Sequence, residues 1–590
     1  MQSRYMSNRR LYAMLFLASA LAAVAVSPTT ILPVFHDRLV DGDSYMRLLR
    51  IEQGLKHGYL ANVVQRDDSG APMVVEWSRL VDAFIVALAA PLAFFVGWHH
   101  ALYIAGVATQ PIFAGALGAS LSFASEPLSK REFLWVAPVV GILLPGVRGF
   151  DAFGVIHYHI ILLAAIAFTL GWCFRARNGA LRPMFYCGIA GGLAIWITPE
   201  TMPFVLLGYV ALGLSWLQRP IGAGMALLGA SFFLTTAFGT LIDPPHGGIW
   251  VAESDRISII YAELALAVAA ACLALAWLDK KPMSGVRRKA FGLVAALLSF
   301  AIWLACWPRI SLGPFGLIPH SDMRVFYGQM AEVQPVTGAT EFFLLLFPGL
   351  FAMVYVLLRA WRSRRDVEAS GAWLVLAAGI ALSTGLTARF VIFQQIPAGF
   401  AAALAPVILT DITDSVVREA AAASLRVSTF FFLLVFPYLP ALTMAYLHPQ
   451  KSVPHGGSCS TVGIGRLLAP ASGKIVLTAV NYAPQLLYRT KIIIVGSLYQ
   501  HGIKGYLRAR AAWRAPATPS PSPQLRATGA EFVLFCNTTA REYLGPHTAK
   551  NSLWALLVEH RPPHWLHLVG EEPKQGFRLY RVAGSSDEHP

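Results

Sequence analysis

The chain has 590 residues, of which 56% are hydrophobic and only 13% are charged, and its mean hydropathy is +0.55. This composition is too apolar for a soluble protein of this length and predicts a membrane protein. A net charge of +15 could indicate nucleic-acid binding, but the basic residues gather at the ends of apolar runs. That distribution is a membrane-topology signal, so we expect a lipid bilayer and no nucleic acid as partner.

Apolar runs long enough to cross about 30 Å of hydrocarbon recur from Leu11 to about Leu447. The first run lacks a clear cleavage site, so we interpret it as a retained span rather than a signal peptide. The run Leu80–Trp98 would break the alternation of sides, and we interpret it as an interfacial helix. Basic clusters, each expected to be cytoplasmic, occur at Lys130–Arg131, Arg175–Arg177, Arg219, Lys280–Lys289 and Arg359–Arg365.

This alternation predicts a mainly α fold, a polytopic bundle of about 13 transmembrane helices with a cytoplasmic N-terminus and an external C-terminus. We expect a transmembrane domain over residues 1–447, with external loops at 36–98, 146–159 and 308–340. Residues 448–590 should form a small external α/β domain. Its expected strands are Lys474–Val480, Lys491–Tyr499 and Glu531–Cys536, and its expected helix is Asn551–Glu559.

Two cysteines, Cys459 and Cys536, fall in this C-terminal region. They could form a disulfide if the region is exported, but the sequence does not place them within bonding distance.

The first external loop opens with a cluster of acidic residues directly after the first span. It carries Asp41 and Asp43, followed by Tyr45 and Arg47. Carboxylates just outside a membrane can hold a divalent cation or deprotonate an acceptor hydroxyl, and nearby arginines can receive a lipid phosphate. The alternative interpretation is a solvated loop with a turn at Asp41–Gly42.

Four segments in order along the chain resemble landmarks of the oligosaccharyltransferase catalytic subunit and of related bacterial GT-C membrane glycosyltransferases. The landmarks are an acidic residue followed by Tyr and an Arg-rich helix, an acidic or Asp-His-His segment, a Ser-x-Ser-Glu-like segment, and an Arg-Phe pair at a late span. The corresponding segments are Asp43–Arg47, Gly154–His159, Met330–Pro335 and Arg389–Phe390.

This resemblance implies a GT-C fold with catalytic external loops. It implies Asp43 and Glu332 as catalytic residues and a donor phosphate held by Arg389, with Tyr45 and Arg47 as further substrate-binding residues. Beside the resemblance, the acidic cluster makes Asp41 a third catalytic candidate, and Arg66 is a further candidate for the phosphate. Glu200 lies between two apolar runs, where an ionised carboxylate is costly unless it is used or paired, so we add it as a substrate-binding candidate. The chain departs from the family in two places. Histidines stand where an aspartate is expected in the second landmark. The Trp-Trp-Asp-type motif that reads an Asn-x-Ser/Thr acceptor has no counterpart.

His157 and His159 have two interpretations. They could bind a metal together with Asp43 and Glu332, because imidazole and carboxylate ligands suit manganese or zinc. Equally, they could be interfacial histidines bonded to phosphate or backbone. We therefore expect a divalent cation, manganese or magnesium, only under the first interpretation.

The predicted function is transfer of a sugar or glycan from a polyprenyl-phosphate-linked donor to an extracytoplasmic acceptor, which is a lipid-linked glycan, a polysaccharide or a protein. The expected location is the bacterial inner membrane. One alternative is a transporter or flippase of a lipid-linked intermediate, for which charged pairs or broken helices near mid-bilayer are expected. Another is a non-catalytic subunit of a surface-polysaccharide complex.

Overall fold

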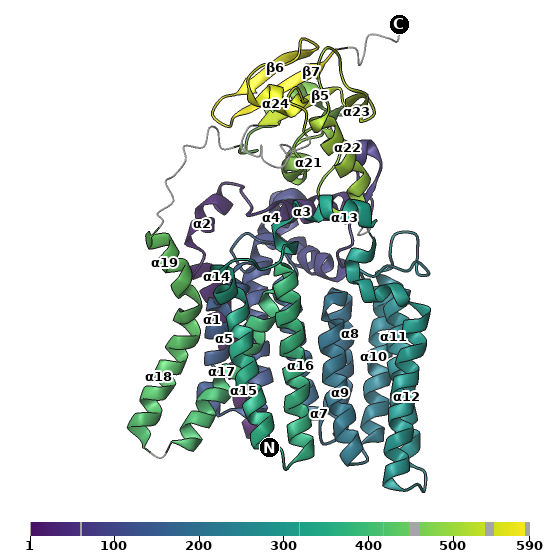
Figure 1. The fold of residues 1–590 in the computed structure, drawn as a ribbon, viewed down its shortest axis with the longest axis vertical. Helices are drawn as coiled ribbons and strands as arrows, with labels where there is room; N and C mark the ends of the chain where they lie inside the picture. The colour runs from purple at the N-terminus through teal and green to yellow at the C-terminus, as the bar shows by residue number, and fades with distance from the viewer. Residues whose placement is uncertain are drawn as a thin grey trace. The chain divides into compact units, whose positions relative to one another are not determined.

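The computed structural model describes residues 2–58, 62–317, 319–416, 418–447, 459–536 and 548–583. The chain divides into two compact units (Figure 1). We call one the helical unit, comprising Met1–Ile31, Val107–Gly316 and Met330–Pro449. The other is the mixed unit, comprising Leu32–Gly106, Leu317–Gln329 and Gln450–Pro590. The mixed unit thus combines most of the first predicted external loop with the C-terminal region.

The helical unit is a bundle in which α10 packs against both α8 and α11, and α11 packs against α12 (Figure 1). Its helices are α1 (Gln2–Ala25), α5 (Val136–Leu143), α6 (Pro145–Arg148), α7 (His159–Ala176), α8 (Leu181–Ile197), α9 (Met202–Gln218), α10 (Gly222–Ile242), α11 (Ile259–Asp279), α12 (Gly285–Cys306), α14 (Ala339–Glu341), α15 (Phe347–Arg362), α16 (Val367–Arg389), α17 (Gln395–Ser415), α18 (Glu419–Val435) and α19 (Leu439–Leu447).

Two helices contain residues of both units. They are α2 (Pro28–Phe35) and α4 (Arg79–Ser125). Helix α4 is broken at Gly97, whose φ of 74° lies in the left-handed region that glycine adopts without strain. The break falls at the end of the run Leu80–Trp98, which the sequence analysis set apart from the spans that follow.

Small residues let the helices of the bundle approach closely. A Cβ added to Gly188 of α8 would lie 2.4 Å from the carbonyl oxygen of Leu228 in α10, and one added to Gly229 would lie 2.9 Å from Cα of Ala269 in α11. Lipid tails are as apolar as leucine, so close backbone packing of this kind replaces the hydrophobic effect as the force that holds membrane helices together. Gly188 and Gly229 therefore have a packing role.

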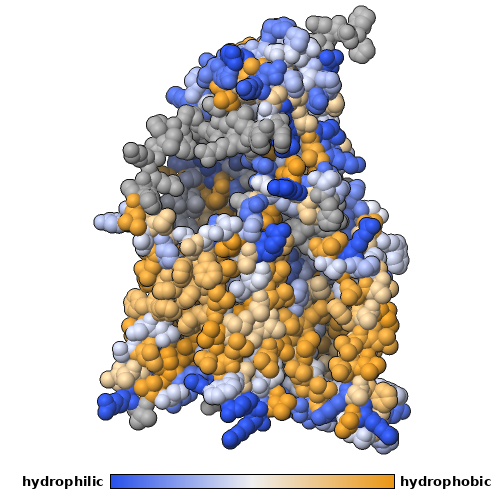
Figure 2. Space-filling model, in the orientation of Figure 1, coloured by the Kyte–Doolittle hydropathy of each residue, from blue (hydrophilic) through white to orange (hydrophobic). Residues whose placement is uncertain are grey.

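Ten helices among the described residues are long and apolar enough to cross a membrane, and the bent pair Arg9–Ala25 and Pro28–Phe35 allows an eleventh span. The predicted arrangement of about 13 spans is reached only if the 17-residue α8 and the shorter α5 are also counted. Figure 2 shows a broad band of hydrophobic side chains over the helices, with hydrophilic residues at their ends. The chain is a multi-pass membrane protein.

Ion pairs connect the basic clusters at one end of the bundle. Arg177 and Arg219, from two different loops, both contact Glu368 at the start of α16. Arg175 pairs with the carboxylate of Glu126, at the end of α4, and Lys130 Nζ lies 2.6 Å from Asp414 Oδ1, at the end of α17. These loops therefore share one end, as the alternating topology requires; we call it the basic end.

The mixed unit contains a five-stranded sheet in the order β4-β3-β5-β7-β6. Strand β3 is parallel to both β4 and β5, and β7 is antiparallel to β5 and β6. Three strands and the helix α24 match the sequence prediction of a small α/β domain, whereas β6 and β7 were not predicted. The bounds are β3 (Ile475–Leu477), β4 (Ile493–Ile494), β5 (Phe532–Cys536), β6 (Leu566–Glu572), β7 (Phe577–Val582), α20 (Gly465–Leu468), α21 (Ala483–Arg489), α22 (Ile503–Arg514), α23 (Pro523–Arg526) and α24 (Leu553–Val558).

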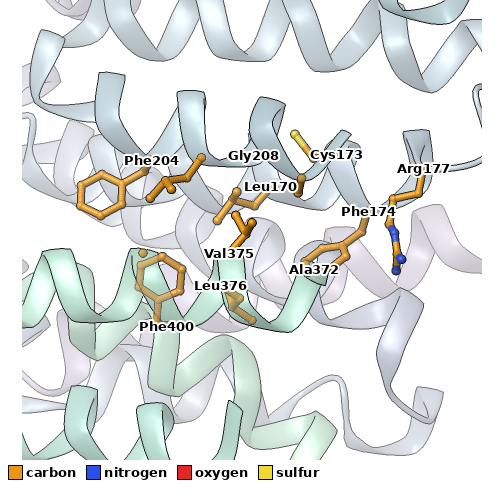
Figure 3. Close-up of a pocket in the computed structure, with 13 residues that line it drawn as sticks. Leu170, Cys173, Phe174, Arg177, Phe204, Gly208, Ala372, Val375, Leu376 and Phe400 are labelled. Atoms are coloured by element: carbon orange, nitrogen blue, oxygen red, sulfur yellow. The ribbon is translucent and has the colours of Figure 1, made fainter. Parts of the chain in front are cut away.

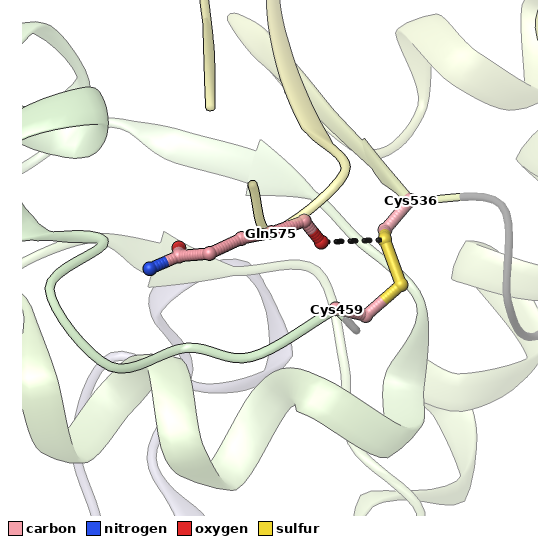
Figure 4. Close-up of a disulfide and its surroundings, with 3 residues drawn as sticks. All are labelled: Cys459, Cys536 and Gln575. Carbon is pink, nitrogen blue, oxygen red and sulfur yellow. Dashed lines mark hydrogen bonds between the residues drawn. A yellow bond between two sulfur atoms is a disulfide. The ribbon is translucent and has the colours of Figure 1, made fainter. Parts of the chain in front are cut away.

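A disulfide joins Cys459 to Cys536 at the end of β5 (Figure 4). The backbone carbonyl of Gln575 accepts a hydrogen bond from Cys459 N at 2.8 Å, and its oxygen lies 3.7 Å from Cys536 Sγ. The disulfide closes a 77-residue separation and so reduces the freedom of the unfolded chain. Its formation requires an oxidising compartment.

The first-loop segment forms an integral part of the mixed unit. It contains α3 (Gly42–Lys56), the hairpin of β1 (Val63–Val64) with β2 (Met73–Val74), and the turn Asp68–Gly70. The backbone nitrogen of Ile494 in β4 donates to the carbonyl of Arg66 at 2.9 Å, and Arg508 of α22 pairs with the carboxylate of Asp68. The helix α13 (His320–Tyr327) joins the same unit through Phe326, whose ring packs edge-on against Tyr506.

Asp67 gives this unit a predictable pH dependence. Its buried carboxylate accepts hydrogen bonds from Ser497 Oγ and Asp68 N, yet burial raises its pKa to about 6. A folded-state pKa above the unfolded value means that the native state binds the proton more tightly. The contribution of Asp67 to the free energy of unfolding is therefore fully present below its unfolded-state pKa, and it is lost as the pH rises through about 6.

We expect Asp67→Asn, which keeps an acceptor and removes the charge, to gain up to roughly 2–3 kcal/mol over the wild type between pH 4 and pH 7. The measurement is the thermal unfolding midpoint of both proteins at pH 4.5 and pH 7.5. Glu531→Gln, which alters a half-exposed carboxylate paired with Lys474, serves as the control. Parallel pH profiles for the wild type and Asp67→Asn would contradict the assignment.

Candidate functional site

Asp41 and Asp43 lie at the N-terminal end of α3. Asp41 is the N-cap, and its Oδ1 accepts a hydrogen bond from Ser44 N at 2.8 Å. Asp43 lies in the first turn, where the helix dipole favours a negative charge. The acidic cluster is therefore built into a helix start, and the helix predicted to follow it is present.

Tyr499 fixes the orientation of Asp43. Its hydroxyl donates a hydrogen bond to Asp43 Oδ1 at 2.7 Å, and its ring packs edge-on against Trp77. Burial, together with the charges of Asp43, Asp41 and Glu76, raises the pKa of Tyr499 well above its ordinary value. Tyr499 therefore remains a proton donor to an ionised Asp43.

Glu76 and His501 add a second pair of polar groups near Tyr499. One ligand atom of Glu76 and one of His501 lie within 4.8 Å of each other, and both side chains are half-buried. Carboxylate oxygen and imidazole nitrogen are ligands that transition metals accept. This part of the mixed unit thus offers a donor set that is chemically suited to a divalent cation.

Arg47 is engaged within the protein. It is 2% exposed, its Nη1 lies 2.8 Å from Asp82 Oδ1, and its guanidinium stacks over Trp77. Arg50 pairs with the other oxygen of the same carboxylate. Two buried cations thus share one anion, which gives Arg47 a role in positioning α3. Its contact with a donor phosphate stays a prediction.

Arg66 and Tyr45 also hold the mixed unit together. The guanidinium of Arg66 donates to three backbone carbonyls, those of Leu487, Thr490 and Ile492, at 2.6–2.9 Å. The hydroxyl of Tyr45 accepts from Leu39 N at 2.9 Å, and its buried ring packs against Tyr488. Arg66 thus binds the first-loop segment to the C-terminal segment, and Tyr45 contacts both segments. Both residues therefore help to position the first-loop segment.

The two predicted metal-binding histidines lie together at the start of α7 in the helical unit. The ring centroids of His157 and His159 are 5.5 Å apart, and His159 is stacked between Phe150 and Tyr158. Nearby, the pKa of Asp151 is raised to about 7, because the effect of burial is larger than the opposite effect of its ion-pair partner Arg148, 2.7 Å away.

Glu200 lies in the short turn between α8 and α9. The hydroxyl of Tyr158 donates to Glu200 Oε1 at 3.2 Å, and the turn is capped by Thr198. Tyr158 therefore links Glu200 to the segment that carries His157 and His159. These three predicted site residues belong to one neighbourhood of the helical unit.

The segments that carry Glu332 and Arg389 are bonded to each other. Val391 N donates to the carbonyl of Gln334 at 3.1 Å, and Val336 N donates to that of Ala388 at 3.0 Å. Two landmarks more than 50 residues apart in sequence are thus adjacent.

Arg389 ends α16 and stands directly before the next candidate span, Val391–Ser415. It is exposed, and its guanidinium lies 4.7 Å from the ring centroid of Phe390. Within the described residues Arg389 forms no ion pair with an acidic side chain. Its charge is therefore available to an external anion.

Asp43 and Asp41 belong to the mixed unit, whereas His157, His159, Glu200, Glu332 and Arg389 belong to the helical unit. Their convergence on one cavity stays a prediction. Sequence reasoning missed Tyr499, Glu76 and His501. The one available signal was the polar run Tyr499–His501, which ends an apolar predicted strand, a place where functional side chains are often found.

Comparison with known proteins identifies the fold. No protein-family model matches the chain, and no curated protein matches it in sequence. Among solved structures, the chain is similar to the oligosaccharyltransferase AglB from Archaeoglobus fulgidus in complex with an inhibitory peptide and a dolichol-phosphate. The two are 12% identical, the match covers 98% of this chain and 75% of that one, and the TM-score is 0.66.

Two further structures of the Archaeoglobus fulgidus oligosaccharyltransferase agree with this match. The apo form is 14% identical, with 90% of this chain and 70% of that chain covered and a TM-score of 0.62. A complex with Zn and sulfate is 13% identical, with 97% and 73% covered and a TM-score of 0.63. At this level of identity the likeness establishes architecture. The chain has the GT-C membrane fold seen in the archaeal oligosaccharyltransferase.

Proposed function

We propose that this chain is a GT-C glycosyltransferase that transfers a sugar or glycan from a polyprenyl-phosphate-linked donor to an extracytoplasmic acceptor. The observation that carries the proposal is the hydrogen bond that orients Asp43 at the start of α3, in a chain with the fold of an oligosaccharyltransferase. An oriented carboxylate directly after the first span is suited to activate an acceptor hydroxyl.

In the proposed reaction Asp43 takes the proton of the acceptor hydroxyl, and the acceptor oxygen forms a bond to the anomeric carbon of the donor sugar. The bond between that carbon and the phosphate oxygen breaks, and the polyprenyl phosphate leaves with the electron pair. Arg389 binds the phosphate and stabilises its growing charge. Asp41 caps α3 and so supports Asp43.

The proposal includes a divalent cation, for which carboxylate oxygen and imidazole nitrogen are suitable ligands. Asp43, Glu332, His157 and His159 would hold it, and Glu76 with His501 provides a further carboxylate and imidazole in the mixed unit. Bound there, manganese, magnesium or zinc would neutralise charge on the leaving phosphate. Glu200, bonded to Tyr158, would then orient the sugar beside the histidines.

The acceptor is a hydroxyl-bearing lipid-linked glycan, polysaccharide or protein. The similar oligosaccharyltransferase binds an inhibitory peptide, but this chain lacks a counterpart of the Trp-Trp-Asp-type motif, which disfavours an Asn-x-Ser/Thr peptide. We place the chain in the bacterial inner membrane with the mixed unit outside, where an oxidising compartment would support the Cys459–Cys536 disulfide.

The test is mass spectrometry of lipid-linked sugars in a strain lacking the gene, followed by reconstitution. We expect a polyprenyl-linked sugar to accumulate and the purified chain to consume it while releasing polyprenyl phosphate. Accumulation without consumption by the purified chain would instead favour a non-catalytic subunit. Movement of the intact lipid across vesicles, without release of phosphate, would favour a flippase.

A further inference from the structure

A narrow apolar crevice runs between α7, α9, α16 and α17. It holds about 490 Å³ of space not filled by protein atoms, part of which is open to the outside. Figure 3 shows Phe204 and Phe400 near one end and Arg177 at the other. Small residues on two of these helices, Gly208 and Ala372, leave the space between the larger side chains. An apolar crevice among membrane helices accepts hydrocarbon and excludes water.

A polar pocket of about 640 Å³, part of which is likewise open to the outside, adjoins the crevice at the basic end. Phe174 and Arg177 line both cavities, so the two adjoin at these side chains. The polar pocket is further lined by Arg175, Asn178, Arg219, Asp366 and Glu368. A long apolar space therefore opens into a charged one, which is the distribution of polarity along a phospholipid.

We propose that the two cavities form one binding site for a single aminophospholipid, a lipid whose headgroup carries a phosphate and a primary ammonium. One acyl chain occupies the crevice, and the phosphate lies against Arg177 and Arg219. The ammonium lies against Asp366. Basic pockets between membrane helices near the cytoplasmic surface are established headgroup sites in general, and arginine is well suited to phosphate.

The pairing of charges in the pocket favours a zwitterionic headgroup over an anionic one. Arg175 is already engaged, because it pairs with Glu126 and donates to the carbonyls of Phe123 and Gly171 at 2.8 and 2.9 Å. Arg177 and Arg219 share the single carboxylate of Glu368.

Two groups then remain to meet a ligand. The arginine pair is one of them, because the side chains of Arg177 and Arg219 are 26% and 44% exposed and both line the polar pocket. Asp366 is exposed and uses one oxygen to cap α16, accepting from Ala369 N at 3.0 Å, so its other oxygen is accessible. The pocket is thus lined by cationic groups and by an accessible carboxylate. A primary ammonium can donate hydrogen bonds to that carboxylate, whereas a trimethylammonium cannot.

This site is separate from the proposed donor site. Glu368 and Arg389 lie at opposite ends of α16, which has 23 residues. At 1.5 Å per residue these positions are about 30 Å apart along the helix. The lipid site therefore does not depend on the proposed glycosyl transfer.

Native mass spectrometry of the full chain in detergent tests the site. The probes are phosphatidylethanolamine, phosphatidylcholine and phosphatidylglycerol with identical acyl chains, each added at the same concentration. We expect phosphatidylethanolamine to be retained at least several-fold more than the other two. Glycerophosphoethanolamine, which has the headgroup without the chains, should not displace it.

Three variants separate the parts of the site. Arg177→Gln with Arg219→Gln should reduce retention of all three lipids, because each of them carries the phosphate, and should leave phosphatidylethanolamine preferred over phosphatidylcholine. Asp366→Asn keeps a residue that can cap α16 and should abolish only the preference between the two lipids. Ala372→Phe, which fills the crevice from a half-buried position, should reduce retention of all three lipids.

Arg287→Gln is the matched control, because this exposed arginine belongs to a basic cluster outside the pocket and should leave retention unchanged. If the double arginine variant does not fold, Asp366→Asn and Ala372→Phe still decide the question. Equal retention of the three lipids by the wild type, or a preference for phosphatidylglycerol, would overturn the proposal. So would retention that neither Asp366→Asn nor Ala372→Phe alters.

Discussion

Replacing Asp43 with asparagine is expected to lower the rate of glycosyl transfer by roughly 10²–10⁴-fold, the range for loss of a general base. Asparagine has the same shape and can still accept the hydrogen bond that Tyr499 donates to Asp43 at 2.7 Å. It cannot take a proton from the acceptor. The yield and the unfolding midpoint of the variant should therefore stay near those of the wild type.

The matched control is Asp37→Asn in the same unit. Asp37 is exposed and has a φ of 59°, a conformation that asparagine also tolerates. Activity should be unchanged. A contrasting structural control is Asp82→Asn, which leaves Arg47 and Arg50 buried without their shared anion. There we expect poor yield, since breaking a buried pair costs about 3–5 kcal/mol.

Tyr499 gives the Asp43 prediction a pH signature. In Tyr499→Phe the ionised carboxylate of Asp43 loses a hydrogen bond, so the pKa of Asp43 should rise and the acidic limb of the rate profile should move to higher pH. Tyr506→Phe, which removes another buried hydroxyl in the same unit, should not move that limb. A rate for Asp43→Asn equal to that of Asp37→Asn would show that Asp43 is not the base.

The helical bundle could be predicted from the sequence because each span is a local apolar run bounded by basic loops. Strands β3, β4 and β5 were predictable for a similar reason, since Ile475–Leu477, Ile493–Ile494 and Phe532–Cys536 are rich in β-branched and aromatic residues. Strand β6 was not, because Leu566–Glu572 is mostly exposed and contains glycine and two glutamates.

The composition of the mixed unit could not be predicted, because the contacts that build it span more than 400 residues. Arg66 bonds to the carbonyl of Leu487, and Asp43 to the hydroxyl of Tyr499. Neither the first-loop segment nor the C-terminal segment has a periodic sequence pattern that would identify the other as its partner. For the same reason the sequence suggested phosphate contacts for Arg47 and Arg66, whereas the fold supplies both with protein partners.

Replacing Arg389 is expected to abolish use of the lipid-linked donor without reducing the amount of folded protein. Arg389 is exposed at the end of α16 and forms no ion pair with the acidic side chains described in the structure. Arg389→Leu therefore breaks no ion pair and leaves no described carboxylate without its partner. Arg389→Lys keeps the charge but loses the planar fork that grips two phosphate oxygens, so donor use should fall by a smaller factor.

Arg256→Leu is the opposite case and serves as the control for yield. Arg256 is 2% exposed and bonds to both the carboxylate and the carbonyl oxygen of Asp243. Its loss would leave the fully buried carboxylate of Asp243 without its cation. Breaking such a pair lowers the free energy of unfolding by about 3–5 kcal/mol, so we expect little folded protein. The deciding quantity is transfer activity per amount of folded protein in detergent. Normal specific activity in Arg389→Leu, whatever its yield, would refute the donor-phosphate role, because a residue that binds the leaving group must change the rate.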